Sequence, residues 1–498
     1  MDENNQPQSS ALLNGEQQTT VYTSDPTTNQ SNAFFQKLKN GAYRRNFFHS
    51  LALCFAFCAF GFQIGQRGPA FLDLQQITNT DMKKASTFFT AISVGNLCGS
   101  LFIGFINNRV NKVLLLFVST LLLSVTVSVI PLCSEYVAML AILWTNAFFM
   151  GWLNAGGNAY LLSLWGATEG RSFMQALHSI FAFGAVISPL CTAPFLAQRR
   201  ENNSTVHNAT SLFENQGIFY EVSNMSVHHS SLNVDTTEEQ PSESRLIYAF
   251  VIAGVFQMLT TIPLLIMYIK RTSQTLQNST ENEESKSMKT LPLLTYIFTV
   301  LFIDCLFMCY CAMEDTFASY LSTFTVLHLK WTKAEGSQVT SVFWASFSAA
   351  RFLGIVAIRY IKPGIMLFGC VISITLNFVS FLLCSYYHIP DGVWVFAVFV
   401  GLSMSVVFPT GFSWIQENIL IINGRVASSI LVAASIGTML NPLLNGYLMQ
   451  QVSPMWYCYI LLTESGCLVL FSSLFILYSK VILPKRRVNT TAAYIIDD

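Results

Sequence analysis

The stretch GFINNRVNK, Gly104–Lys112, separates two apolar runs near residues 82–107 and 112–132. Each run is long enough to cross a bilayer as a helix, because about 20 apolar residues span a hydrocarbon core about 30 Å thick. The stretch between them is short and carries Arg109 and Lys112, which favour the cytoplasmic side of a membrane. It therefore predicts a helical hairpin whose two arms cross the membrane.

The composition extends this prediction to most of the chain. Of 498 residues, 52% are hydrophobic and only 11% are charged, whereas soluble domains carry about 25% charged residues. The formal net charge is zero, so no basic field favours nucleic acid as a partner. The Cys and His spacing fits no zinc site, and no nucleophile elbow or phosphate loop occurs. We expect an integral membrane protein in contact with lipid, with no metal, no cofactor and no enzymatic activity.

Apolar runs of this length recur along the chain, and their number predicts an all-α protein with twelve transmembrane helices. We place the spans near 46–74, 82–107, 112–132, 136–163, 170–197, 245–269, 291–325, 334–359, 364–387, 391–416, 425–450 and 456–479.

The loops predict both the orientation and the domains. Lys and Arg are concentrated in the loops that become cytoplasmic if both termini are cytoplasmic. The predicted parts are a disordered tail (1–45), a six-helix half (46–269), a cytoplasmic linker (270–290), a second six-helix half (291–479) and a tail (480–498). The long loop 198–244 becomes extracellular, and it carries glycosylation sequons at Asn202, Asn203, Asn208 and Asn224.

The two halves resemble each other in sequence. GAVISP (Gly184–Pro189) in the fifth span matches GTMLNP (Gly437–Pro442) in the eleventh. A parallel repeat of this kind places a solute site between the halves, near the middle of the membrane. The stretch Gly104–Lys112 also resembles the loop signature of the major facilitator superfamily, although Asn108 and Asn111 stand where Asp and Gly are usual. Arg359 recurs in the equivalent loop of the second half, and we interpret Arg109, Lys112 and Arg359 as gate or loop charges.

Polar side chains inside the spans are the candidate solute ligands, because such groups usually face a bundle interior or a cavity. Amide, imidazole and carboxylate groups suit a neutral polyhydroxylated solute, and indole rings offer flat faces to a sugar ring. The candidates are Gln63, Asn154, Asn158, Gln175, His178, Glu314, Trp344, Trp414 and Asn441.

Each candidate also has a structural alternative. An Asn in a membrane bundle often only joins two helices by a hydrogen bond. His178 and Glu314 are the candidates for coupling to a cation or proton. Arg67 and Glu464 fit structural roles, and Arg351 resembles a charge at the cytoplasmic gate.

Five blocks in both halves resemble the sodium-dependent glucose transporter 1 group of the major facilitator superfamily, also called major facilitator superfamily domain-containing protein 4. They are GPAFLDL (Gly68–Leu74), GGNAYLLSLWG (Gly156–Gly166), MQALHSIFAFGAVISPL (Met174–Leu190), SVFWASFSAARFLGI (Ser341–Ile355) and FPTGFSWIQENI (Phe408–Ile419). The resemblance implies a major facilitator fold and uptake of glucose or a related hexose at the plasma membrane, with Na⁺ as a possible coupling ion.

The chain departs from the family pattern at two positions. The pattern places acids where this chain has Gln63 and Asn154, and a carboxamide neither carries a proton nor attracts a cation as a carboxylate does. We therefore favour facilitated transport by a monomer over sodium symport, with Glu314 left as the acid for coupling. A proton-coupled sugar symporter and a receptor or scaffold that does not transport remain the alternatives.

Overall fold

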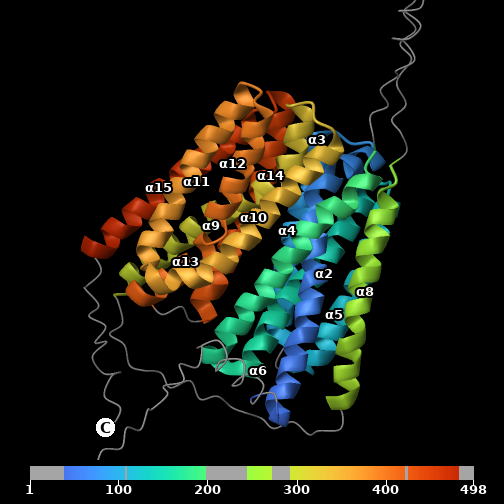
Figure 1. Ribbon diagram of the computed structural model, residues 1–498, viewed down its shortest axis with the longest axis vertical. Coiled ribbons are helices and arrows are strands. Elements are labelled where there is room, and N and C mark those ends of the chain that lie inside the picture. Colours follow the sequence, from blue (N-terminus) through green and yellow to red (C-terminus); the bar gives the residue numbers. More distant parts are fainter. Residues whose placement is uncertain are drawn as a thin grey trace, which may run out of the picture. The chain divides into compact units, whose positions relative to one another are not determined.

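The computed structural model describes residues 37, 39–106, 109–197, 244–271, 292–420 and 424–481, and the regular elements in these ranges are all helical (Figure 1). The chain divides into the units Met1–Phe48 and His49–Asp498, and every contact described below lies within the second. The longer helices are α2 (Gly41–Ile77), α4 (Thr87–Ile106), α5 (Lys112–Val129), α6 (Tyr136–Thr192), α8 (Leu246–Arg271), α9 (Leu293–Leu327), α10 (Lys333–Tyr360), α11 (Pro363–Tyr386), α12 (Pro390–Met404), α13 (Val407–Asn418), α14 (Gly424–Gln451) and α15 (Trp456–Val481).

The number of spans confirms the sequence prediction. Eleven stretches of the described chain are long and apolar enough to cross a membrane. The remaining span is α10, whose apolar character is reduced by charged residues such as Lys333, Glu335 and Arg351. Helix α6 contains the span Tyr136–Gly166 and most of the span Phe173–Phe195, and the first of these ends at Gly166. The φ angle of +66° at Gly166 is one that a residue without Cβ adopts at low cost, so the chain bends there.

The helices form two groups that follow the chain order. In the first half α4 packs on α6, and α5 packs on both α6 and α8. In the second half α9 packs on α14 and α15, and α10 packs on α12. The halves meet where α10 lies against α6 and where α14 lies against α4 and the short helix α3 (Met82–Ala85).

Within each half, glycines let helices approach at backbone distance. A Cβ at Gly61 would lie 1.8 Å from the carbonyl oxygen of Phe181, and one at Gly184 would lie 2.0 Å from that of Cys58. In the second half, a Cβ at Gly437 would lie 2.6 Å from the carbonyl oxygen of Met308. The matching glycines of the two repeats therefore pack in the same way, each against the first helix of its own half.

Between the halves, side-chain hydroxyls donate to backbone carbonyls. Ser337 and Ser341 of α10 donate to the carbonyls of Pro189 and Val186, both at 2.6 Å. Where α4 meets α14, Thr90 donates to the carbonyl of Met439 at 2.9 Å.

Ser93 donates to the carbonyl of Thr438 at 3.1 Å. Pro442 has no N–H to donate to that carbonyl, four residues earlier, so the carbonyl is available to the opposite half. The prolines of the two repeats thus lie beside the backbone carbonyls that accept hydrogen bonds from the other half.

These contacts lie toward one end of the bundle, which we call the Asp73 end. Here α2, α9 and α14 finish and α4 and α10 begin. We call the other end, where α6 bends, the Gly166 end. Across the parts of the chain that are described, the side-chain hydrogen bonds between the halves occur in the portion of the bundle nearer the Asp73 end.

Candidate functional site

Two of the predicted amides form a pair on α6. Asn158 Nδ2 donates to Asn154 Oδ1 at 3.1 Å, and both side chains are half-buried. Asn158 Oδ1 is buried and has no hydrogen-bond partner among the described residues. Beside it, a Cβ at Gly157 would lie 2.6 Å from the ring of Phe57 on α2. The glycine thus lets α6 approach α2 closely, while Asn158 keeps one acceptor without a protein donor.

His178 adjoins the same phenylalanine from the second span of α6. Its ring lies 6.2 Å from that of Phe57, edge to face. Gln175 lies one turn earlier, and both side chains are half-buried. Two of the predicted ligands, Asn158 and His178, therefore belong to segments of α6 that pack around one side chain of α2.

Arg351 of α10 was not among the predicted ligands, yet it lies near two of them. Arg351 interacts electrostatically with Glu314 on α9 and with His178 on α6. Its guanidinium carbon lies 4.9 Å from the centre of the Phe347 ring. Arg351, which resembles a charge at the cytoplasmic gate in the sequence, lies within α10 and in range of two predicted ligands. Its position inside an apolar span was the available sign of a functional role.

Gln63 lies within the first half rather than between the halves. Its Nε2 donates to Gln257 Oε1 at 3.0 Å, and Asn146 Nδ2 lies 3.5 Å from its Oε1. Asn146 also donates to Thr126 Oγ1 at 3.1 Å. These contacts connect α2, α5, α6 and α8, so Gln63 in this conformation joins helices as the structural alternative describes.

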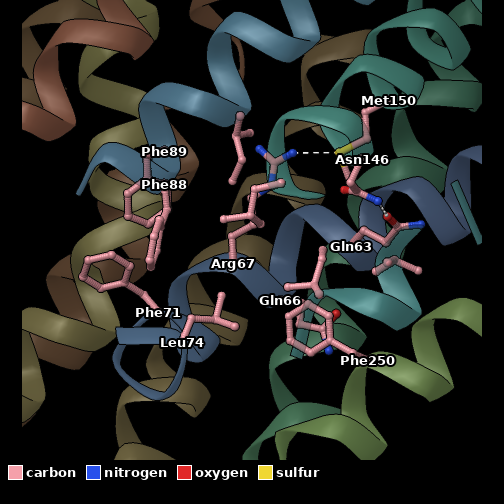
Figure 2. Close-up of a pocket in the computed structure, with 14 residues that line it drawn as sticks. Gln63, Gln66, Arg67, Phe71, Leu74, Phe88, Phe89, Asn146, Met150 and Phe250 are labelled. Atoms are coloured by element: carbon pink, nitrogen blue, oxygen red, sulfur yellow. Dashed lines mark hydrogen bonds between the residues drawn. The ribbon is translucent and has the colours of Figure 1, made fainter. Parts of the chain in front are cut away.

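A small cavity of about 30 Å³ lies beside this network (Figure 2). It has room for about two water molecules, not for a hexose. Gln66 lines it, is 1% exposed and has no hydrogen-bond partner among the described residues. Arg67 also lines it and donates to Met150 Sδ at 2.8 Å. Arg67 interacts electrostatically with Asp315 of the other half.

Asn441 lies inside the second half. It donates to Thr316 Oγ1 at 2.6 Å and to the carbonyl of Ala312 at 3.2 Å, which fastens α14 to α9. Asn445, one turn later, is fully buried, and neither atom of its amide has a partner in the described chain. The predicted ligand Asn441 thus has its donors occupied by its own half.

The two predicted stacking rings also have protein neighbours. Trp344 is 6% exposed and packs against Phe343 and Phe347. Trp414 lies against Phe475 of α15, with ring centroids 5.6 Å apart. In this conformation Trp414 faces the interior of the second half.

The loop residues and sequons are only partly described. Arg109 is exposed and Lys112 begins α5, whose first turn is capped by Asn111. Arg359 lies in the last turns of α10. The sequons at Asn202, Asn203, Asn208 and Asn224, like most of both tails and of the linker, lie outside the described residues.

Asp73 forms a buried ion pair between the halves that was not predicted from the sequence. Its carboxylate is fully buried on α2 and pairs with Lys333 at the start of α10. It also accepts hydrogen bonds from Ala197 N at 2.9 Å and from Ser244 Oγ. An acid near the end of an apolar span, opposite a loop lysine, was the sequence feature that indicated this pair.

Comparison with known proteins gives both sequence and structural relatives. No family model matches the chain. The chain is 30% identical over 387 residues to sodium-dependent glucose transporter 1 of Xenopus laevis, which covers 76% of this chain and 72% of that protein.

Two solved structures share the fold. One is the major facilitator superfamily transporter FucP in its outward conformation, with a TM-score of 0.53, 15% identity and coverage of 86% of this chain and 99% of that chain. The other is a mutant of the nucleoside transporter NupG, with a TM-score of 0.56, 11% identity and coverage of 87% and 99%.

Proposed function

Because the chain belongs to the major facilitator superfamily, in the group of the sodium-dependent glucose transporter 1 proteins, we propose that it carries a small neutral polyhydroxylated solute, glucose or a related hexose. The chain is a multi-pass membrane transporter and not an enzyme. The observation that carries the choice of solute is the set of amide, imidazole and carboxylate groups on α6 and α9. This set agrees with the similarity of the chain to the sodium-dependent glucose transporter 1 group.

The chemistry of these side chains supports a hydroxyl-rich ligand. The unpartnered Oδ1 of Asn158 accepts a hydroxyl hydrogen, and the amide of Gln175 and the ring of His178 both donate and accept. Each such hydrogen bond contributes about 0.5–1.5 kcal/mol net, since it replaces a bond to water. Several together compensate for removing the hydroxyls from water.

Alternating access follows from where the halves touch. The hydrogen bonds between the halves lie nearer the Asp73 end, so the conformation is closed there. With both termini cytoplasmic, as the loop charges predict, the Asp73 end is extracellular and the conformation faces inward. Rocking one half against the other would break these contacts and open the Asp73 end.

The mode of coupling follows from the acids that remain. Gln63 and Asn154 are amides, so neither supplies a carboxylate. Gln63 is hydrogen-bonded within its own half, and Asn154 pairs with Asn158. Glu314 is the acid that interacts electrostatically with Arg351, which in turn interacts with His178. We therefore propose facilitated transport rather than sodium symport, by a monomer in the plasma membrane.

Uptake by proteoliposomes tests the proposal. The purified chain should give saturable uptake of labelled glucose or another hexose, and a sodium gradient or a pH gradient should change the initial rate less than about twofold. Asn154→Asp, run in parallel, restores an acid at the position where the family pattern has one, and we expect it to gain cation dependence.

Other outcomes contradict parts of the proposal. Uptake by the wild-type chain that rises many-fold with a sodium gradient excludes the facilitated mode. Uptake driven by a pH gradient favours proton coupling. A folded chain that shows no saturable flux of hexoses or polyols contradicts the transport of such a solute and favours the receptor alternative.

A further inference from the structure

Arg351 is a cation inside the bundle whose hydrogen-bonding capacity is largely unused. Its side chain is half-buried, and its Nε is buried without a hydrogen-bond partner in the described chain. No described carboxylate forms an ion pair with it within 4.0 Å. A buried cationic N–H without an acceptor is costly, so the Nε of Arg351 is available to an oxygen atom that a ligand supplies.

The helix register places Arg351 beside the predicted ligands on α6. Ser337 pairs with Pro189 and Ser341 pairs with Val186, so α10 and the second span of α6 run antiparallel. Arg351 follows Ser341 by ten residues, and His178 precedes Val186 by eight. Continuing the same register brings Arg351 level with this part of α6, in agreement with its electrostatic interaction with His178.

The register with α9 places Glu314 on the other side of the guanidinium. The rings of Phe343 and Phe317 lie 5.0 Å apart, so α10 and α9 are level there. One turn further along α10, Phe347 is level with the turn of α9 that holds Glu314. Arg351 lies over Phe347, because a helical side chain leans toward the N-terminus of its helix. A donor and an acceptor of opposite charge therefore lie near one another on adjacent helices of the second half, on the side of α10 that packs against α6.

The two groups together select for both charge and geometry. The edge of a guanidinium presents parallel N–H donors, which match two oxygens held side by side, as in a vicinal diol or a carboxylate. Glu314 accepts hydroxyl hydrogens and offsets the positive charge of Arg351. An anionic ligand would be repelled by Glu314, whereas a vicinal diol satisfies both groups.

We infer that Arg351 binds the solute directly through adjacent hydroxyl groups, and that its pairing with Glu314 makes the transporter select an uncharged diol over an anionic one. This inference rests on the proposed function, and it adds a specificity-determining residue to it. The solute takes the place of water at the guanidinium edge, and Phe347 keeps the guanidinium in position beneath it.

Competition uptake with two probes tests the inference. Labelled glucose is offered to proteoliposomes alone or with glucuronate, which carries a carboxylate on the same ring. In the wild-type chain glucuronate should compete poorly. Arg351→Lys keeps the charge but loses the parallel donors, so the KM for glucose should rise at least tenfold, as expected when a charge-assisted hydrogen bond is lost.

Glu314→Gln distinguishes binding from a structural role. It leaves Arg351 without a counter-charge, and we expect glucuronate to become a competitor at concentrations that the wild-type chain ignores. Arg351→Gln combined with Glu314→Gln removes both charges and should lose this new preference. Arg245→Gln, at an exposed arginine just before α8, is the matched control and should change neither KM nor competition.

The outcomes separate the two proposals. If the wild-type chain transports glucose and Arg351→Lys has the wild-type KM, the inference is wrong and the proposed function stands. An unchanged glucuronate response in folded Glu314→Gln also contradicts the inference, and thermal unfolding of each variant establishes folding. A wild-type chain that transports no neutral polyol overturns the proposed function and the inference together.

Discussion

The carboxylate of Asp73, which is fully buried on α2, accepts a hydrogen bond from the Nζ of Lys333 on α10. The lysine side chain is 21% exposed, so water reaches only one member of the pair. Because the two residues belong to different halves, the pair stabilises the conformation that is closed at the Asp73 end. Asp73 also accepts hydrogen bonds from Ala197 N and Ser244 Oγ, both of its own half, which hold its carboxylate in place for Lys333.

We predict that Asp73→Asn opens the Asp73 end. Removing one charge of a buried pair costs about 3–5 kcal/mol, largely because its partner loses compensation; the partial exposure of Lys333 reduces this cost. Hydrogen–deuterium exchange should increase in residues 333–345 and 186–196, and the thermal unfolding temperature should fall. Asp391→Asn, at an exposed acid in the first turn of α12, is the control. Equal exchange in both variants would contradict a closing role for the pair.

The hydroxyls of Thr90 and Ser93 should stabilise the same conformation through α14. Replacing both with Ala removes their hydrogen bonds to the carbonyls of Met439 and Thr438, at about 0.5–1.5 kcal/mol each. Exchange of the amides around residues 437–445 should rise several-fold. Ser435→Ala is the control, because its hydroxyl bonds only to Leu431 of its own helix. A control effect as large as that of the double variant would contradict a role between the halves.

The glycine contacts within the first half predict strong sensitivity to a single methyl group. In Gly61→Ala the new Cβ would lie 1.8 Å from the carbonyl oxygen of Phe181, so α2 and α6 must separate. We expect a loss of about 1–3 kcal/mol, as for overpacked cores. Gly369→Ala has no atom within 4 Å of its Cβ and should be neutral. The yield and thermal stability of the two purified variants provide the measurement. Equal stability would be inconsistent with close packing of α2 on α6 at Gly61.

His328 predicts a loss of stability at mildly acidic pH. Burial lowers the pKa of His328, just past the end of α9, although its hydrogen bond to the carbonyl of Ser385 acts in the opposite direction. His388, stacked on it at 4.9 Å, and Lys330 lower it further.

The unfolded chain therefore binds the proton more readily than the folded one, and stability rises with pH up to the ordinary histidine pKa of about 6.5. Below that pH the contribution is progressively lost. His328→Gln should flatten the dependence of the unfolding temperature on pH between about 5.5 and 7.5. A variant with the same slope as the wild-type chain would refute this assignment.

The sequence predicted the spans well because length and apolar character alone determine a transmembrane helix. The span predicted at 334–359 is less apolar than the others. The structure still forms α10 there, because helices of both halves pack on it. The paired glycines and prolines correctly indicated a repeat, since close packing and a missing N–H depend on local sequence.

The candidate ligands were harder to place. Gln63 and Asn441 have the same residue type as Asn154, but their amides bond within their own halves. Sequence spacing gives the face of a helix and not the neighbour opposite that face. The approach of Arg351 to Glu314 and His178 was not predicted for the same reason, because it depends on the register of three helices.

The close glycine contacts lie within each half, whereas the hydroxyl–carbonyl contacts lie between the halves. This contrast determines what a bound solute must accomplish. The close glycine contacts make each half stiff, while each hydroxyl–carbonyl hydrogen bond between the halves is individually weak. Their sum sets the resting population of the two orientations. A solute shifts that population only by binding one orientation more tightly, and about 5.5 kcal/mol moves it from 1:99 to 99:1. A carrier whose halves were fused by stronger bonds would need more energy than a sugar supplies, and it would bind without turning over.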